Sequence, residues 1–305
     1  MDEQKKEVAF GCWQLTRDNK TAEGLKKASE CIDLAWEKGT RVFDTAAVYG
    51  LGESEKILSK TLGHKRNEAQ IITKCGLNWN NPKGKRAKIM VDNSSSSIYS
   101  SVISSLERLD VEVLSAVLLH RKDESTPIEE SLECLSELKE KGYIKKIGLS
   151  NHDKEDITFA HKNFNIEYCQ FEYSYLIRDN IDLLGICKQL NIVTMSYSSL
   201  ARGALTRKYL DGYVKFQDGD IRNRVDTFTK EKRKVYEPII SKLNKHALMY
   251  GHTVSSLSLR WLLDVEGIDL AITGIKNRNH FQDIEKAITT SLPDELLELF
   301  KQKVI

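Results

Sequence analysis

The sequence lacks several features that would assign the protein to a class at once. Lys and Arg total 46 against 44 for Asp and Glu, so the formal net charge of +2 is too small to indicate nucleic acid or an anionic membrane surface as a partner. No uncharged apolar run approaches the roughly 18 residues that span a bilayer, and the first residues show no apolar signal-peptide segment. We therefore expect a cytoplasmic protein that is neither exported nor inserted in a membrane.

Cysteine pairs and metal motifs are also missing. The six cysteines are scattered without a Cys-x-x-Cys pair, which in a chain of 305 residues favours reduced thiols over disulfides. The histidines show no metal-ligand spacing, so we expect no bound metal. No Gly-x-Gly-x-x-Gly sequence follows a β-rich run, so nothing supports a Rossmann domain.

Short β-rich runs alternate with amphipathic segments along the whole chain. This alternation is typical of a parallel sheet, and the length suits one eight-stranded barrel. We expect a single α/β domain over residues 1–305: a (β/α)8 TIM barrel with a β segment at its N-terminus and long loops at its C-terminal face. The expected strands are residues 8–13, 41–45, 70–74, 114–120, 144–150, 167–171, 192–197 and 269–274.

The segments between these strands carry local signals. Thr126, Pro127 and Glu129 match a capping box at the start of a helix. Residues 76–93 and 198–229 lack regular signals, and long loops after barrel strands build the active face. We therefore expect both segments to cover a ligand.

Potentially reactive side chains recur at the ends of the expected strands, where barrel enzymes place catalysis. Asp44, Lys74 and His120 each end a strand, and Tyr49 follows five residues after Asp44. A free tyrosine has a pKa near 10, so it is a poor acid at neutral pH unless a cation such as Lys74 stabilises its phenolate. Asp44 would orient Lys74, and His120 would hydrogen-bond a substrate oxygen. Singly, each residue also suits a turn cap, packing or a buried histidine, so the prediction depends on the four together.

Two segments then indicate a family. Residues 43–50 read Phe-Asp-Thr-Ala-Ala-Val-Tyr-Gly and residues 52–55 read Gly-Glu-Ser-Glu, which resembles the signature of the aldo-keto reductase family. Further matches follow in family order at residues 72–74, 118–120, 148–151, 170–173, 197–200 and 272–274. The resemblance implies that Asp44, Tyr49, Lys74 and His120 are the catalytic tetrad, and that NADPH transfers a hydride to an aldehyde or ketone. His120 stands where a branch that reduces steroid carbon–carbon double bonds carries Glu, which favours carbonyl chemistry.

The resemblance also implies a site for NADPH or NADP+. Ser150, Asn151 and Gln170 are expected to hold the nicotinamide carboxamide, Tyr197 to stack on its ring, and the loop beginning at residues 198–202 to cover the pyrophosphate. Lys276 and Arg278 would bind the 2′-phosphate, which favours NADPH over NADH. Four positions depart from the family pattern: Cys12 replaces Thr, Thr273 replaces a common Pro, and Asp283 and Ile284 stand where Glu and Asn usually contact adenine. The expected cofactor residues are Gly11, Cys12, Trp13, Asp44, Ser150, Asn151, Gln170, Tyr197, Ser198, Leu200, Arg202, Gly274, Lys276, Arg278, His280 and Asp283.

The expected partner is a small carbonyl substrate bound by Trp13, Tyr49, Trp79 and His120. A basic cluster beside Trp79 (Lys83, Lys85, Arg86 and Lys88) favours a polar substrate such as a sugar over a steroid, although a solvated basic loop is the simpler explanation of the cluster. Three alternatives stay open: NADP-dependent oxidation of a sugar or polyol, a non-catalytic NADPH-binding accessory subunit like the potassium-channel β subunits, and an unrelated barrel hydrolase or isomerase. The last requires a carboxylate pair or metal ligands at strand ends, which the sequence does not offer.

Overall fold

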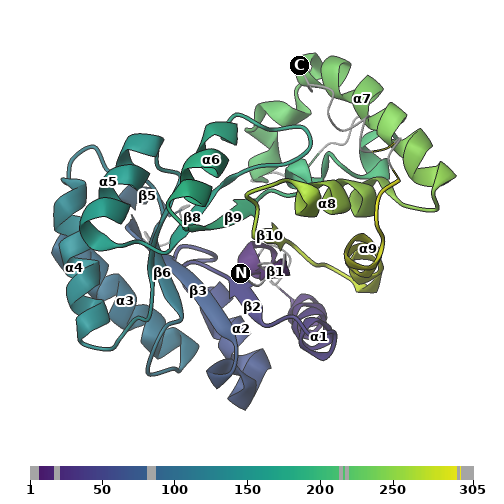
Figure 1. Cartoon of the computed structure of the whole chain (residues 1–305). Helices are drawn as coiled ribbons and strands as arrows, with labels where there is room; N and C mark the ends of the chain where they lie inside the picture. Colours follow the sequence, from purple (N-terminus) through teal and green to yellow (C-terminus); the bar gives the residue numbers. More distant parts are fainter. Residues whose placement is uncertain are drawn as a thin grey trace.

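The computed structural model describes residues 7–16, 21–80, 87–212, 216, 220–293 and 296. Eight parallel strands close into a barrel in the order β1-β10-β9-β8-β7-β6-β3-β2 (Figure 1). The N-terminal β segment is itself a barrel strand, paired with β2 and β10. The predicted (β/α)8 fold is therefore confirmed. The strands are β1 (Glu7–Gly11), β2 (Val42–Asp44), β3 (Gln70–Cys75), β6 (Ala116–Leu119), β7 (Ile147–Ser150), β8 (Tyr168–Glu172), β9 (Val193–Tyr197) and β10 (Leu270–Thr273).

Helices surround the barrel because each carries an apolar face that packs on the strands. In α1, for example, Ala28, Ile32 and Ala35 are buried, and the Thr21 hydroxyl accepts a hydrogen bond from the Gly24 N–H at the helix start. Among the described residues, no helix has the length and apolar character that crossing a bilayer requires. The helices are α1 (Ala22–Glu37), α2 (Glu53–Leu62), α3 (Ser95–Leu109), α4 (Ile128–Glu140), α5 (Lys154–Phe164), α6 (Ile181–Gln189), α7 (Lys230–Met249), α8 (Val254–Asp264) and α9 (Arg278–Thr289).

The apolar core has two layers. The larger lies between strands and helices, and a smaller cluster fills the barrel itself: Ala9, Val42, Ile72, Ala116, Leu118, Tyr168, Met195, Leu270 and Ile272. Gly148 belongs to the inner layer, because a Cβ there would stand 2.4 Å from the Leu118 side chain and 2.6 Å from that of Tyr168. Side chains alternate along a strand, so the residue two positions beyond each inner-layer residue also points into the barrel, at its carboxyl end.

The two segments expected to be irregular contain short regular elements. Residues 76–93 include an antiparallel pair, β4 (Leu77–Trp79) and β5 (Ile89–Val91), so the expectation of an irregular loop is wrong there. Three residues per strand are too few for a period of two to show in a sequence. Lys83, Lys85 and Arg86 lie outside the described residues. After β9, the described residues form short 3-10 helices: η3 (Ala201–Gly203), η4 (Arg207–Tyr209), η5 (Ile221–Asn223) and η6 (Asp226–Phe228).

Helix α4 begins differently from the predicted capping box. Its N-cap residue is Pro127, without a side-chain cap, because the Thr126 hydroxyl donates instead to Asp123 at 2.9 Å. Asp123 also accepts from the Ser125 N–H at 2.9 Å, so this carboxylate organises the turn before the helix. The capping-box prediction is therefore wrong, although the helix itself is present.

Candidate active site

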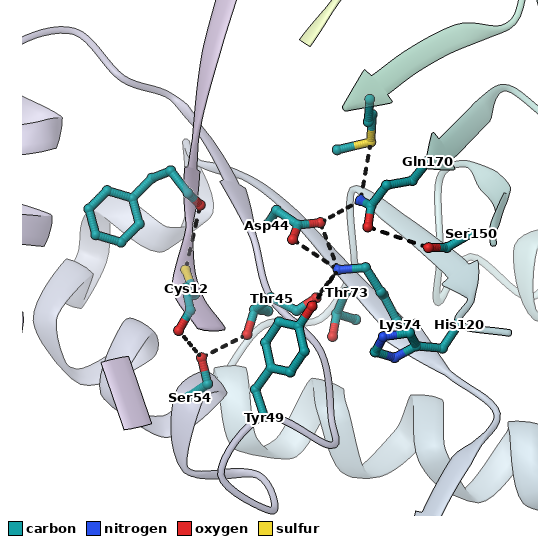
Figure 2. Close-up of polar contacts among 12 residues, drawn as sticks. Cys12, Asp44, Thr45, Tyr49, Ser54, Thr73, Lys74, His120, Ser150 and Gln170 are labelled. Atoms are coloured by element: carbon teal, nitrogen blue, oxygen red, sulfur yellow. Dashed lines mark hydrogen bonds and ion pairs between the residues drawn. The ribbon is translucent and has the colours of Figure 1, made fainter. Parts of the chain in front are cut away.

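The carboxyl ends of the eight strands present one ring of inward positions. Each position lies two residues beyond the inner core layer, so strand alternation alone brings them to the same rim. Asp44 at the end of β2, Lys74 one residue before the end of β3, and His120 directly after β6 belong to this ring. Tyr49 lies on the turn after β2 (Figure 2). The ring consists of Gly11, Asp44, Lys74, His120, Ser150, Gln170, Tyr197 and Gly274.

Lys74 is the buried centre of the ring. Its side chain is 1% exposed, and its ammonium donates to both Asp44 carboxylate oxygens at 2.8 and 2.9 Å and to the Thr45 carbonyl at 2.8 Å. The Tyr49 hydroxyl lies 3.5 Å from the same ammonium nitrogen. A buried ammonium is tolerated only when its N–H groups have hydrogen-bond acceptors and its charge has an anionic partner. These contacts provide both for Lys74.

Burial dominates the acidity of Tyr49. It raises the pKa of Tyr49 above its ordinary value of 10.0, and the smaller opposing effect of the Lys74 charge does not cancel it. The expectation of an unusually acidic phenol is therefore wrong for this structure. Burial acts to lower the pKa of Lys74, but Asp44 and Tyr49 together outweigh it and hold that pKa above 10.5. At neutral pH the pair is a protonated phenol beside a charged ammonium.

His120 faces Tyr49 across the site. Their rings meet edge to face with centroids 5.8 Å apart. Burial, followed by the charges of Lys74 and Arg121, lowers the pKa of His120 well below 6.5, so the imidazole is neutral at neutral pH. Its Nδ1 is buried and has no hydrogen-bond partner among the described residues. A neutral imidazole keeps one N–H donor, which suits a carbonyl oxygen bound beside Tyr49.

The side chains expected to hold a nicotinamide form one network joined to the tetrad. Gln170 Nε2 donates to Asp44 Oδ1 at 2.8 Å, and Ser150 Oγ donates to Gln170 Oε1 at 3.4 Å (Figure 2). Asn151 Nδ2 donates to Ser150 Oγ at 3.0 Å, and Tyr197 Oη donates to Asn151 Oδ1 at 2.5 Å. Asn151 has a φ of 60°, a left-handed conformation that Asn tolerates better than most residues.

Glu55 supports the tetrad without contacting it. The carboxylate is fully buried, accepts from the Thr73 hydroxyl at 2.6 Å and pairs with the Arg108 guanidinium at 2.6 Å. These bonds tie α2 to β3 and α3, beside the turn that carries Tyr49. Glu55 was not among the expected site residues, although its place in the family signature is a signal that marks it.

The segment after β1 is partly turned away from the site. Cys12 is fully buried, its thiol lies 3.8 Å from the Phe10 carbonyl, and burial raises its pKa well above 9.0. The Cys12 carbonyl accepts from the Ser54 hydroxyl at 3.1 Å, which fixes this segment to α2. Trp13, by contrast, is 40% exposed. Trp79, the other tryptophan expected to contact substrate, is half-buried at the end of β4.

Gly274 borders the ring beside Gly11, because β1 and β10 are neighbours. The Gln14 side chain packs directly over Gly274: a Cβ there would lie 1.1 Å from Gln14 Nε2. Gln14 Oε1 is buried without a hydrogen-bond partner among the described residues. Two side-chain-free positions and an orphaned amide oxygen therefore meet on this side of the ring.

Basic side chains gather at the start of α9. Lys276 and Arg278 are exposed, and His280 lies in the first turn, where Asn277 caps the helix by accepting from the His280 N–H at 3.2 Å. Burial is the main cause that lowers the pKa of His280 below 6.5. Asp283 opposes this shift, and the charges of Lys276 and, more weakly, Lys208 add to it. Lys208 lies in η4, so the loop after β9 approaches this helix end. Lys208 was not among the expected cofactor residues, because only folding brings η4 near α9.

The remaining expected cofactor residues lie along these loops. Ser198 follows β9 with a φ of 54°, and Leu200 is half-buried. Arg202 donates to Glu172 at 2.8 Å, and Asp283 accepts from Thr253 on the α8 side at 2.6 Å. Arg202 and Asp283 are thus engaged within the protein. In the described part of the chain, no three His, Cys, Asp or Glu side chains gather as a metal ion requires.

Comparison with known proteins agrees with this geometry. The family model described as "Aldo/keto reductase family" matches residues 7–305. The aldo-keto reductase YhdN of Bacillus subtilis is 30% identical over 296 residues, covering 94% of this chain and 86% of the relative. The aldo-keto reductase yakc [NADP(+)] of Schizosaccharomyces pombe is 27% identical over 303 residues, covering 97% and 87%.

A solved structure shows the same arrangement of the chain. The glycerol dehydrogenase AKR11B4 of Gluconobacter oxydans superposes with a TM-score of 0.88 at 28% identity, covering 98% of this chain and 91% of that one. Sequence signature, barrel and comparisons therefore lead to one conclusion: the chain belongs to the aldo/keto reductase family.

Proposed function

We propose that this protein reduces an aldehyde or ketone to an alcohol with NADPH, and that Tyr49 donates the proton. One observation carries the proposal: the buried Lys74 ammonium joins the Asp44 carboxylate to the Tyr49 hydroxyl, with the neutral His120 imidazole facing them. Six free, buried cysteines suit the reducing cytoplasm.

The residues present fit a nicotinamide cofactor. When bound, NADPH supplies the hydride that adds to the carbonyl carbon. Ser150, Asn151 and Gln170 offer amide and hydroxyl groups for the carboxamide, and Tyr197 offers a ring for stacking. On the opposite side of the ring the Gln14 side chain packs over Gly274, and its buried Oε1 has no hydrogen-bond donor among the described residues.

The outer end of the site favours the phosphorylated cofactor. Lys276, Arg278 and Lys208 approach the N-terminus of α9, where helix N–H groups and cations together bind anions. This arrangement supports NADPH over NADH, in line with the NADP(+) that the Schizosaccharomyces pombe relative carries in its name.

The four tetrad residues then transfer the proton to the substrate oxygen. As the carbonyl oxygen gains the electron pair of the C=O bond, Tyr49 Oη gives it a proton, and Lys74 stabilises the phenolate that remains. Asp44 keeps Lys74 charged and in place, and the His120 N–H directs the oxygen toward Tyr49. Because the phenol is protonated and the ammonium charged at neutral pH, the site is ready for reduction without a prior proton shift.

Oxidation of a polyol is the second candidate. The solved structure named as a glycerol dehydrogenase shares 28% of its sequence with this chain. The same groups serve that direction, because a phenolate beside Lys74 accepts a proton as readily as the phenol gives it. The complete tetrad favours either reaction over a non-catalytic accessory subunit. Trp79 and the exposed Lys88 support a polar substrate in both directions.

The test is loss of nicotinamide absorbance with a panel of aldehydes, ketones and sugars, and the reverse reaction with NADP+ and polyols. Tyr49→Phe should lower kcat by about 100- to 10,000-fold, the usual worth of a positioned acid. NADPH binding, followed by fluorescence, should stay unchanged. Tyr99→Phe, an exposed tyrosine on α3, is the matched control. Full activity of Tyr49→Phe would remove the proposed acid, and turnover of polyols alone would establish the oxidative candidate.

A further inference from the structure

The charges of three cations act to lower the pKa of His120 or Tyr197, and two of these cations have carboxylate partners. Lys74 is buried against Asp44 at 2.8 Å, and Arg202 pairs with Glu172 at 2.8 Å. The third is Arg121, which is exposed. Within the described residues, no hydrogen bond or ion pair of the Arg121 guanidinium is present, and only its backbone carbonyl is engaged.

The backbone of Arg121 is held firmly beside the ring. The residue follows His120, whose carbonyl accepts from Asn151 Nδ2 at 3.0 Å. The Arg121 carbonyl accepts from the buried Asn93 side chain at 3.0 Å. Arg121 therefore leaves the rim of the barrel one residue after His120, and its charge acts to lower the pKa of both His120 and Tyr197.

The next residue shows what an ordinary surface cation does in the same loop. Lys122 turns to the start of α5 and pairs with Asp153 at 3.1 Å and Asp156 at 3.0 Å. Two consecutive cations therefore differ: acidic groups neutralise the Lys122 charge, whereas the part of the chain that the structure describes offers no such partner to Arg121. A guanidinium without a partner among the described residues attracts anions and binds carboxylate or phosphate through two parallel N–H groups.

We propose that Arg121 selects carbonyl substrates that carry a carboxylate or phosphate group, and binds that group while the carbonyl oxygen lies between Tyr49 and His120. The inference rests on the proposed function and adds a substrate class to it: anionic aldehydes and ketones. Arg121 is a specificity-determining residue, and it takes no part in the proton transfer.

The experiment compares two aldehydes of matched shape. 4-Carboxybenzaldehyde carries a carboxylate, and methyl 4-formylbenzoate carries a neutral ester at the same position of the same ring. A second pair, glyceraldehyde 3-phosphate and glyceraldehyde, extends the comparison to phosphate. For the wild type we expect a higher kcat/KM for the anionic member of each pair.

Arg121→Gln should lower kcat/KM for the anionic aldehyde about tenfold, the order expected for one charge-assisted bidentate contact. The loss should fall mainly on KM, and the neutral partner should change less than about twofold. Arg121→Lys should recover part of the preference, because it keeps the charge but not the planar pair of donors. Lys145→Met removes an exposed charge from the opposite rim, before β7, and should change neither substrate.

Four outcomes overturn the proposal. An equal loss of kcat/KM on both aldehydes would make Arg121 a general structural residue. An equal effect of Lys145→Met would show that the preference depends only on the net charge of the protein. A wild type without anionic preference refutes it directly, and a weaker NADPH affinity in Arg121→Gln would assign Arg121 to the cofactor. In each case reduction of the neutral aldehyde, and its loss in Tyr49→Phe, still tests the proposed function separately. Thermal melting of each variant confirms that it folds.

Discussion

The Asp44 carboxylate and the Gln170 amide, 126 positions apart in the chain, are joined by a 2.8 Å hydrogen bond. The same oxygen, Asp44 Oδ1, accepts from the Lys74 ammonium at 2.8 Å. One carboxylate therefore positions both the cation beside the proton donor and the amide expected to hold the nicotinamide. Because β2 and β8 lie apart in the strand order of the barrel, this bond crosses its interior.

Gln170→Leu should test that link. The substitution removes the donor to Asp44 and the acceptor from Ser150, so we expect KM for NADPH to rise about tenfold, as for the loss of one or two buried hydrogen bonds. A smaller fall in kcat should follow, because the Asp44 carboxylate loses one of the hydrogen bonds that hold it in place. Steady-state kinetics with varied NADPH measure both. Gln189→Leu, on the exposed side of α6, should leave both constants unchanged. A fall in kcat with unaltered KM would assign Gln170 to the tetrad alone.

The pH profile of reduction should be flat from about pH 7 to about pH 9 at saturating NADPH. Reduction needs Tyr49 protonated, and burial raises its pKa above 10.0, so the active form is lost only as pH rises through that raised value. It also needs neutral His120, whose pKa lies well below 6.5, so that form is lost only as pH falls through the lowered value. A basic limb centred near neutrality would contradict the assignment of Tyr49 as the acid.

Glu55→Gln should destabilise the fold without touching the chemistry. The change leaves the mostly buried Arg108 without its anionic partner, and we expect a loss of roughly 2 to 4 kcal/mol in the free energy of unfolding. Denaturant unfolding followed by circular dichroism measures it. Glu53→Gln, two residues earlier, removes only an exposed pair with Lys56 and should cost about 1 kcal/mol or less. Similar values for the two variants would show that the buried pair contributes little.

Charge at the start of α9 should decide the choice of cofactor. Removing both cations in Lys276→Ala with Arg278→Ala should raise KM for NADPH at least about tenfold, since each contact to a phosphate is charge-assisted. KM for NADH, which lacks that phosphate, should hardly change. The matched control is Lys60→Ala with Lys145→Ala, two exposed lysines on α2 and before β7. Equal changes with both cofactors would place the 2′-phosphate elsewhere.

Several elements could be read from the residues because their signals are local. All eight expected strands are present, and the residues at their ends meet in one ring, since parallel strands of a barrel share a rim. The β4–β5 pair and the 3-10 helices after β9 were missed, because such short elements depend on contacts outside their own sequence. The start of α4 was misplaced because Asp123 competes for the Thr126 hydroxyl.

The sequence by itself determined the barrel and the meeting of Asp44, Tyr49, Lys74 and His120, because the period of two along each strand and the order of strands decide which side chains point inward at the rim. Only the tertiary structure decided the direction of the Tyr49 pKa, the pairing of Arg202 and the lack of a partner for Arg121 among the residues that the structure describes. These depend on burial and on charges brought together from distant parts of the chain, and a local pattern contains neither.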